Sequence, residues 1–313
     1  MIMRKIYLAF GLVVSMFLGT NLSAQTTFDY TGTVETYTVP AGVSMISIQC
    51  VGAEGGEVTN PTSPGVPGLG ADMYGEFSVT PGQVLNIIVG EKPPTSDRSS
   101  GGGGGSFVWD DGTGTLLIAA GGGGGACAYN ANCDGVDAVV TEDGTHGQTQ
   151  VEGAGTGGNG GTTPALSPGG YAGGGAGWLS DGSVGSLHGC TFTCTGGQNP
   201  LAGAAGGDKG GGSGMNERGG YGGGGGGNGK CGVVGAGGGG GYSGGGPGGA
   251  YPSTSGWNGG GGGGSYNSGT SQVNVGGANS GDGQVIITEL CTGLTYTVSD
   301  DTVCVGDEVT LDA

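Results

Sequence analysis

Residues 101–125 of the chain are GGGGGSFVWDDGTGTLLIAAGGGGG, in which two apolar segments lie between two runs of five glycines. The segments 106–109 and 116–119 contain the aromatic and aliphatic residues that favour strands, and the DDGTG sequence of 110–114 is typical of a turn. This stretch therefore predicts a β-hairpin that begins and ends in a glycine tract.

Further strands are predicted on both sides of this hairpin. Segments rich in β-branched and aromatic residues lie at 28–30, 35–39, 45–51, 73–79, 84–89 and 284–288. In segment 45–51 the alternation places Ile46, Ile48 and Cys50 on one face. The Thr-Pro-Gly-Gln sequence at 80–83 is typical of a hairpin connection, and no segment after residue 24 has helical periodicity. The sequence therefore predicts an all-β fold.

Glycine dominates the composition. The chain of 313 residues contains 87 glycines and 12 prolines, 99 together, a share that by itself favours disorder. The tracts at 101–105, 121–125, 222–227, 237–241 and 259–264 lack the G-X-Y period of collagen. A glycine tract can instead form an extended threefold helix with polyproline II dihedrals, whose N–H and C=O groups must bond to neighbouring helices or to water. Because the tracts alternate with strands, turns and cysteines, we expect an ordered bundle rather than a flexible linker, which would contain fewer aromatic residues.

The N-terminus has the three parts of a secretory signal peptide. Arg-Lys at 4–5 precedes an apolar run at 6–18, and small and polar residues follow up to Ala24. This pattern predicts a signal peptide over residues 1–24, cleaved between Ala24 and Gln25, and a chain that is secreted or held at the cell surface. The apolar run is shorter than the ~20 residues of a spanning helix. No second apolar run follows, so we expect no membrane insertion after cleavage.

The chain is acidic, with 7 basic and 25 acidic residues and a formal net charge of −18. Such a surface repels the phosphate backbone of nucleic acids and the headgroups of anionic lipids. We therefore expect no nucleic acid partner, and any charged partner should be cationic.

Eight cysteines favour the oxidising side of a membrane, and no repeated C-x₂-C motif of a zinc ribbon occurs. The six in the glycine-rich part of the chain are candidates for disulfides, namely Cys50, Cys127, Cys133, Cys190, Cys194 and Cys231. Their pairing stays open, because sequence alone does not give disulfide connectivity.

The order of tracts and strands resembles that of a known extracellular domain. The segments that carry the resemblance are GGGGGSFVW at 101–109, LLIAAGGGGG at 116–125, GGYAGGGAGW at 169–178, GGGGGYSGGG at 237–246, GGGGGGSYN at 259–267 and GDGQVII at 281–287. They are similar to the glycine-rich domain of the anaplastic lymphoma kinase and leukocyte tyrosine kinase receptor ectodomains, which also occurs in secreted bacterial proteins. For domain 25–290 the resemblance implies a jelly-roll-like β-sandwich, similar to tumour necrosis factor, with an inserted bundle of polyglycine II helices.

The resemblance also implies a binding function. In the receptors this domain takes part in binding a cytokine ligand, and polyglycine II bundles form the tips of some phage tail adhesins. No local motif matches the receptors' contact residues. The H-R-D and D-F-G motifs of kinases are absent, so a receptor tyrosine kinase label would reflect domain homology only.

The sequence changes character after residue 290. Segments 294–298 and 302–311 resemble the first strands of a bacterial immunoglobulin-like repeat, a domain that needs ~100 residues. We therefore expect 291–313 to be the start of a truncated repeat in a longer surface protein, in which Cys304 pairs beyond Ala313.

Residues with catalytic chemistry are scarce. The two histidines are His146 and His188, and the carboxylate pair at 110–111 lies in turn sequence. The segments 224–230 and 241–245 match a P-loop and a nucleophile elbow by letters, but neither lies between a predicted strand and a helix. We therefore expect no enzyme, no catalytic residue, no cofactor and no metal site.

Two functional interpretations remain. The first is a binding or adhesion module in which the bundle supports loops at 91–100, 129–153 and 164–168 that face an extracellular protein or glycan. The alternative is a purely structural extracellular spacer or matrix protein, which could be disordered. Ligand identity and oligomeric state lie beyond the sequence.

Overall fold

The computed structural model describes residues 24–129, 131–163, 171–185, 193–209, 216–229, 234–249 and 257–290. In these residues ten strands form two antiparallel sheets of five strands each, and the short 3₁₀ helix η1 (Pro200–Ala202) accompanies them. The prediction of an all-β fold is therefore confirmed. The same residues contain no helix with the length and hydropathy that crossing a membrane requires.

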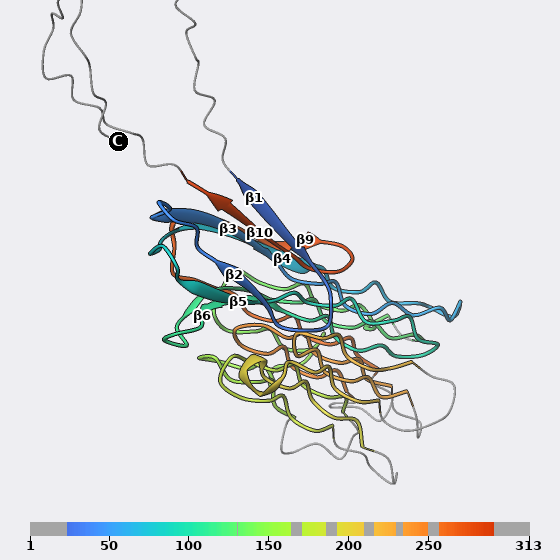
Figure 1. Ribbon diagram of the computed structural model, residues 1–313. Helices are drawn as coiled ribbons and strands as arrows, with labels where there is room; N and C mark the ends of the chain where they lie inside the picture. The colour runs from blue at the N-terminus through green and yellow to red at the C-terminus, as the bar shows by residue number, and fades with distance from the viewer. Residues whose placement is uncertain are drawn as a thin grey trace, which may run out of the picture.

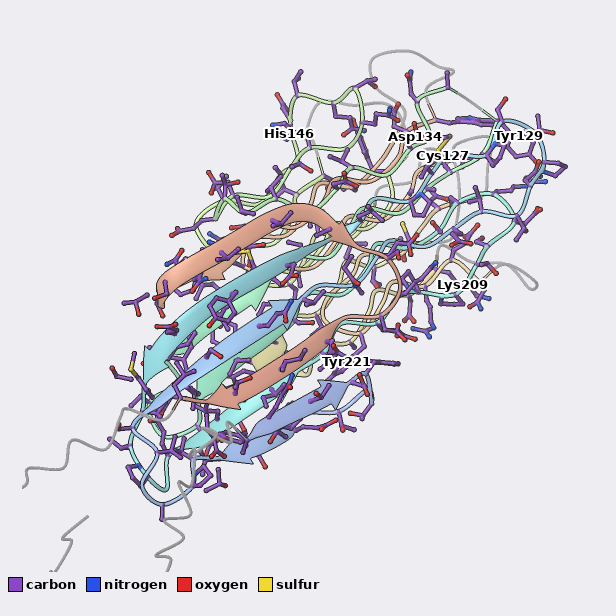
Figure 2. All side chains as sticks on the ribbon, turned by 90° about the horizontal axis from the view of Figure 1, so that it is seen from above. Cys127, Tyr129, Asp134, His146, Lys209 and Tyr221 are labelled. Atoms are coloured by element: carbon purple, nitrogen blue, oxygen red, sulfur yellow. A yellow bond between two sulfur atoms is a disulfide. The ribbon has the colours of Figure 1, made fainter. Side chains whose placement is uncertain are left out.

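The first sheet has the strand order β1-β10-β3-β4-β9, and Figure 2 shows it face on, with β9 at one edge and β1 at the other. Its strands are β1 (Gln25–Asp29), β3 (Met45–Val51), β4 (Gly70–Ser78), β9 (Thr270–Asn279) and β10 (Gln284–Glu289). Strand β10 pairs with β1 on one side and β3 on the other, so Val285 lies between Phe28 and Cys50. The end of the domain is thereby fixed against its beginning.

The second sheet has the order β2-β5-β6-β7-β8. Its strands are β2 (Glu35–Thr38), β5 (Val84–Ile88), β6 (Ser106–Asp110), β7 (Leu116–Ala120) and β8 (Tyr266–Asn267). Strands β6 and β7 are the hairpin predicted from residues 101–125. Strands β8 and β9 were not predicted, because β8 has only two residues and β9 buries none of its ten.

The core between the sheets consists of alternate side chains from both. Ile46, Ile48 and Cys50 of β3 are fully buried in it, as the alternation of that segment predicts. Leu85 and Ile87 of β5 reach the same cluster from the other sheet. The two sheets are therefore packed face to face.

The opposite face of the second sheet is also buried. Phe107 and Trp109 of β6 point away from the core between the sheets and pack on Trp178 of the glycine-rich region, with ring centroids 6.0 and 5.7 Å apart. The second sheet therefore lies between the first sheet and the glycine-rich segments, which run side by side beneath it (Figure 1).

The backbone hydrogen bonds of the glycine tracts repeat every three residues. The N–H groups of Gly122 and Gly125 both donate to tract 237–241, at 2.8 and 2.9 Å. The two N–H groups between them donate to two other segments, at Ala53 and Val136. Consecutive residues of one tract thus bond to three different neighbours.

The same repeat occurs in tract 237–241. The N–H groups of Gly237 and Gly240 donate to Ser100 and Gly103, at 3.0 and 2.9 Å, and the N–H groups between them donate elsewhere. These tracts therefore hold one another mainly through backbone groups, while Gly121 and Gly262 donate to the hydroxyls of Ser265 and Thr145.

The tracts pack so closely that no side chain fits between them, which explains why these positions are glycine. A Cβ atom added at Gly239 would meet backbone atoms of Gly122 and Gly123 closer than 3.0 Å, a distance that real Cβ atoms essentially never show. A Cβ atom at Gly102 would meet the backbone of Gly238 in the same way. Neighbouring backbone occupies the volume that a side chain would need.

Candidate binding loops at the end of the glycine bundle

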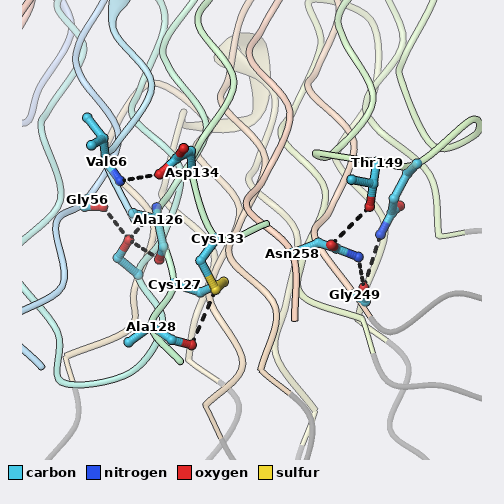
Figure 3. The surroundings of a disulfide bond; sticks show 12 residues. Gly56, Val66, Ala126, Cys127, Ala128, Cys133, Asp134, Thr149, Gly249 and Asn258 are labelled. Atoms are coloured by element: carbon cyan, nitrogen blue, oxygen red, sulfur yellow. Dashed lines mark hydrogen bonds between the residues drawn. A yellow bond between two sulfur atoms is a disulfide. The ribbon is translucent and has the colours of Figure 1, made fainter. Parts of the chain in front are cut away.

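A disulfide closes a short loop at the end of the bundle that lies far from the sheets (Figures 2 and 3). It joins Cys127 to Cys133, whose Cα atoms are 4.6 Å apart, and both residues are fully buried. The Cys127 N–H also donates to the Cys133 carbonyl at 2.9 Å. Two of the predicted disulfide cysteines are therefore bonded to each other, a pairing that the sequence left open.

This loop presents Tyr129 in a strained conformation. The φ of Tyr129 is 78°, which is rare for a bulky residue and costs ~1–3 kcal/mol. Several contacts hold it: the Tyr129 N–H donates to Thr62 at 3.0 Å, and its hydroxyl accepts a hydrogen bond from the Asn60 amide. Its ring packs edge to face on Trp257, with centroids 4.9 Å apart. Both rings are only partly buried.

The neighbouring loop at 60–66 is fixed to the disulfide loop by polar contacts. The Thr62 N–H donates to Asn60 Oδ1 at 3.0 Å, which folds the loop on itself. The Val66 N–H donates to Asp134 Oδ1 at 2.8 Å, as Figure 3 shows. Asp134 follows the second cysteine of the disulfide, so its carboxylate ties the two loops together. At the end of the bundle, the partly exposed rings of Tyr129 and Trp257 and the amide of Asn60 therefore lie on loops whose backbone is fixed by hydrogen bonds.

The three loops expected to face a ligand differ in exposure. Segment 91–100 is exposed only in part: Glu91, Ser96 and Ser99 are at 8% exposure or less, whereas Thr95, Asp97 and Arg98 are exposed, so the expectation of a loop that is open along its whole length is wrong. Segment 129–153 runs along the surface and ends near Val151, which is 76% exposed. Segment 164–168 lies outside the described residues.

The start of segment 91–100 is held by charged residues that contact distant parts of the chain. Glu91 accepts two hydrogen bonds from the Arg218 guanidinium and one from the Tyr221 N–H at 3.0 Å. Next to it, Lys92 pairs with Glu54 at 3.0 Å. The contacts of Glu91 join it to residues 127 and 130 positions away, and no local motif in the sequence signals them.

The pKa values of this cluster follow from its burial and charge. Burial alone would raise the pKa of Glu91, but the hydrogen bonds from Arg218 and from the Tyr221 N–H hold it below its ordinary value. Burial and then the Glu91 charge raise the pKa of Tyr30 to about 12. At neutral pH the cluster is therefore a carboxylate held by a guanidinium beside a neutral phenol.

Cys50 and Cys194 differ from the expectation of disulfides, because both are free thiols. Cys50 is fully buried in the core between the sheets, and burial raises its pKa. Burial also raises the pKa of Cys194, to about 12. In the core, the Cys50 side chain packs against apolar residues and not against a second cysteine. Cys190 and Cys231 lie outside the described residues.

The predicted cleavage site lies at the start of the described chain. Ala24 and Gln25 are both exposed, and Gln25 is the first residue of β1. The Ala24 carbonyl accepts a hydrogen bond from the Glu289 N–H at 2.9 Å. Cleavage between the two residues stays a prediction.

The described residues that could carry chemistry have structural contacts instead. His146 Nδ1 accepts the Ala154 N–H at 3.0 Å, and Asp110 accepts the Thr113 N–H within its turn. Ser243, the serine of the apparent nucleophile elbow, is fully buried and accepts the Gly158 N–H at 3.0 Å. Within the described ranges, no three or more His, Cys, Asp or Glu residues are grouped so that they could hold a metal ion.

No protein-family model matches this chain, and no curated protein matches it.

Proposed function

We propose that this chain is a secreted or cell-surface binding or adhesion module, in which a rigid bundle of polyglycine II helices carries ligand-facing loops. The observation that supports this function most directly is the disulfide-closed loop with Tyr129 at φ 78°, at the end of the bundle remote from the sheets. Strained residues of this kind cluster at ligand-binding sites, where surrounding contacts keep them in place. Tyrosine and tryptophan are also the residues that contribute most to recognition surfaces.

The proposal of polyglycine II helices is supported by the three-residue repeat of the hydrogen bonds. In a helix with three residues per turn, every third N–H group points in the same direction and reaches the same neighbour. Gly122 with Gly125, and Gly237 with Gly240, follow this rule. A bundle of this kind supports the loops at its end because each tract is held on several sides.

The sandwich belongs to the same proposal. Two five-stranded antiparallel sheets packed face to face agree with a jelly-roll-like relation to tumour necrosis factor. The relation to the glycine-rich receptor domains rests on the tract segments and their order, and it favours a binding role. The proposal includes no catalysis, because His146 and Ser243 are engaged in backbone hydrogen bonds.

A structural spacer is the second candidate. The dense backbone bonding between the described tracts favours it, since a stiff rod needs no ligand. Saturable binding separates the two candidates, because a spacer should bind nothing saturably.

Arrays of extracellular glycans and extracellular proteins, probed with the full chain, test the binding role. We expect saturable binding to at least one ligand class, and a loss of at least about 2 kcal/mol of binding free energy in Tyr129→Ala, as for a central aromatic contact. The matched control is Val151→Ala, an exposed position in the same surface segment. Absence of saturable binding to every probe would favour the spacer.

A further inference from the structure

Two aromatic rings at the end of the bundle form a corner. The ring planes of Tyr129 and Trp257 are inclined at 84°, with their centroids 4.9 Å apart. Trp257 packs on the cluster around the disulfide, and both rings stay partly exposed. The face of an aromatic ring carries partial negative charge and attracts the weakly positive hydrogens of C–H groups. This aromatic corner therefore suits a ligand that has a face of C–H groups.

Hydrogen-bond donors and acceptors both lie beside the aromatic corner. The Asn60 amide donates to the Tyr129 hydroxyl, which leaves the hydrogen of that hydroxyl for a further acceptor. The same amide lies 3.5 Å from an oxygen of Asp97, whose carboxylate only accepts. Arg98 follows, and its guanidinium only donates; its carbonyl accepts the N–H of Ala128, the neighbour of Tyr129, at 2.8 Å. A ligand at the corner therefore meets polar groups of both kinds.

The two charges beside the corner oppose each other. The Arg98 guanidinium lies 3.7 Å from the Asp97 carboxylate, and both side chains are about half exposed. Arg98 would repel a cationic ligand, and the net charge of −18 would repel an anionic one. The charges of the site therefore favour an uncharged ligand.

Hydrogen bonds fix the backbone that carries the rings. Two of its residues have left-handed φ values, 78° at Tyr129 and 47° at Ser63. Trp257 precedes the buried Asn258, whose Oδ1 accepts a hydrogen bond from the Thr149 hydroxyl at 3.1 Å (Figure 3). A site that is ordered in advance loses less conformational entropy when a ligand binds. The rings are thus held ready for a small and rigid ligand unit.

We infer that the aromatic corner binds sugar units of an uncharged extracellular glycan. A pyranose ring presents a face of C–H groups, which stacks on an aromatic face, and a rim of hydroxyls that both donate and accept. Its C–H face lies on the exposed part of Trp257, and its hydroxyls accept from Tyr129 and Arg98 and donate to Asp97. The inference rests on the proposed binding function of the same loops, to which it adds the class of ligand.

A protein partner fits the surroundings of the rings less well. A stable protein interface buries about 800 Å² of each partner and has an apolar centre. The neighbouring residues 59–64 are Thr-Asn-Pro-Thr-Ser-Pro, and the exposed Val66 follows them. One exposed valine beside short polar residues does not make such a centre, whereas a sugar unit needs only the rings and a few polar groups.

An array of three ligand classes tests the inference with the full chain. The probes are neutral oligosaccharides, the same oligosaccharides carrying sialic acid or sulfate, and extracellular proteins stripped of their glycans. We expect saturable binding to neutral oligosaccharides, weakened at least about 30-fold in Tyr129→Ala. Tyr129→Phe loses only the hydroxyl and should weaken binding ~2- to 10-fold. The control Val151→Ala should bind like the wild type.

The indole N–H signals in an NMR titration test the place of binding. The chain has three tryptophans, of which Trp109 and Trp178 are each 7% exposed. The neutral oligosaccharide that binds best should shift the indole signal of Trp257 and leave the other two in place. In Tyr129→Ala this shift should be lost while the other two indole signals persist, which shows that the variant is folded.

The outcomes separate the ligand class from the binding role. Binding only to charged oligosaccharides or only to the stripped proteins, lost in Tyr129→Ala, overturns the uncharged glycan and leaves the proposed function standing. Neutral binding that Tyr129→Ala does not weaken, or that leaves the Trp257 signal in place, overturns this site. Absence of saturable binding to every probe overturns both proposals and favours the spacer.

Discussion

The sandwich and the glycine bundle are both buried and ordered, but they are held by different atoms. In the sandwich, side chains such as Ile48 and Leu85 fill the space between two sheets, and apolar burial stabilises the packing at ~25 cal/mol per Å². In the bundle, backbone fills the space, and N–H groups such as those of Gly122 and Gly240 bond laterally from tract to tract. The difference decides what each region tolerates. The sandwich should suffer when a side chain is removed, and the bundle when one is added.

Ordering the bundle costs more conformational entropy than ordering a chain of other residues. Ordering a glycine costs ~0.5–1 kcal/mol more than ordering an alanine, and a backbone hydrogen bond contributes ~0.5–1.5 kcal/mol net. A tract therefore gains from order only if nearly all its backbone groups are bonded. Dense lateral bonding is then a condition for the bundle to exist.

The largest effect is expected for Gly239→Ala. Its Cβ would meet backbone of Gly122 and Gly123, and neither carbonyl can move without breaking its own hydrogen bonds. Inserted atoms in a packed interior usually cost ~1–3 kcal/mol and occasionally more; here we expect loss of the folded bundle, measured by circular dichroism and chemical denaturation. Gly112→Ala is the control, because its Cβ would lie 3.4 Å from one side-chain atom of Asp110. Equal stability of the two variants would contradict backbone packing as the reason for glycine.

Phe107→Ala should have the next largest effect, because its side chain joins the two regions. It is fully buried between the second sheet and Trp178. Removing a buried phenylalanine costs ~3–5 kcal/mol, and we expect this loss in the denaturant midpoint. Amide hydrogen exchange should quicken on both sides of the contact, in β6 and around Trp178. Faster exchange confined to the sandwich would show that the two regions fold independently.

Glu91→Gln should have the smallest effect, and a pH-dependent one. It weakens the contacts to Arg218 and Tyr221, and because Arg218 is about half exposed we expect a loss of ~1–2 kcal/mol at pH 7. The folded pKa of Glu91 lies below its ordinary value of 4.5, so its contribution is complete above that pH and is lost as pH falls through the lowered pKa. Denaturation at several pH values should show wild type and variant converging in acid. If the difference in unfolding free energy between wild type and variant stayed the same from pH 7 to pH 3, the Glu91 carboxylate would not be its source.

Much of the sandwich could be predicted from local sequence. The 101–125 hairpin and the inward face of Ile46, Ile48 and Cys50 follow from alternation and turn residues. Strand β9 could not be predicted, because it buries no face and so carries no hydrophobic pattern. Its place at the sheet edge depends on β4, almost 200 residues earlier in the chain.

The contacts of the candidate loops could not be predicted from local sequence either. Cysteine spacing made Cys127 and Cys133 candidates, but the free thiol of Cys50 shows that the number and spacing of cysteines do not fix their pairing. The contact of Tyr129 with Trp257 and the clamp of Glu91 on Arg218 join residues that are more than a hundred positions apart. Such contacts have no local signature.

By itself, the sequence determined that the chain is all-β, that glycine tracts separate its strands, and that its charge is acidic. These properties depend on residue type and short-range periodicity, which act within a few positions of the chain. Only the tertiary structure decided which tract bonds which, where Tyr129 is presented and which strand remains open. A tract of glycine has no side chain to specify its neighbours, so its partners are set by the strands that fix its two ends and by the backbone groups left to be satisfied.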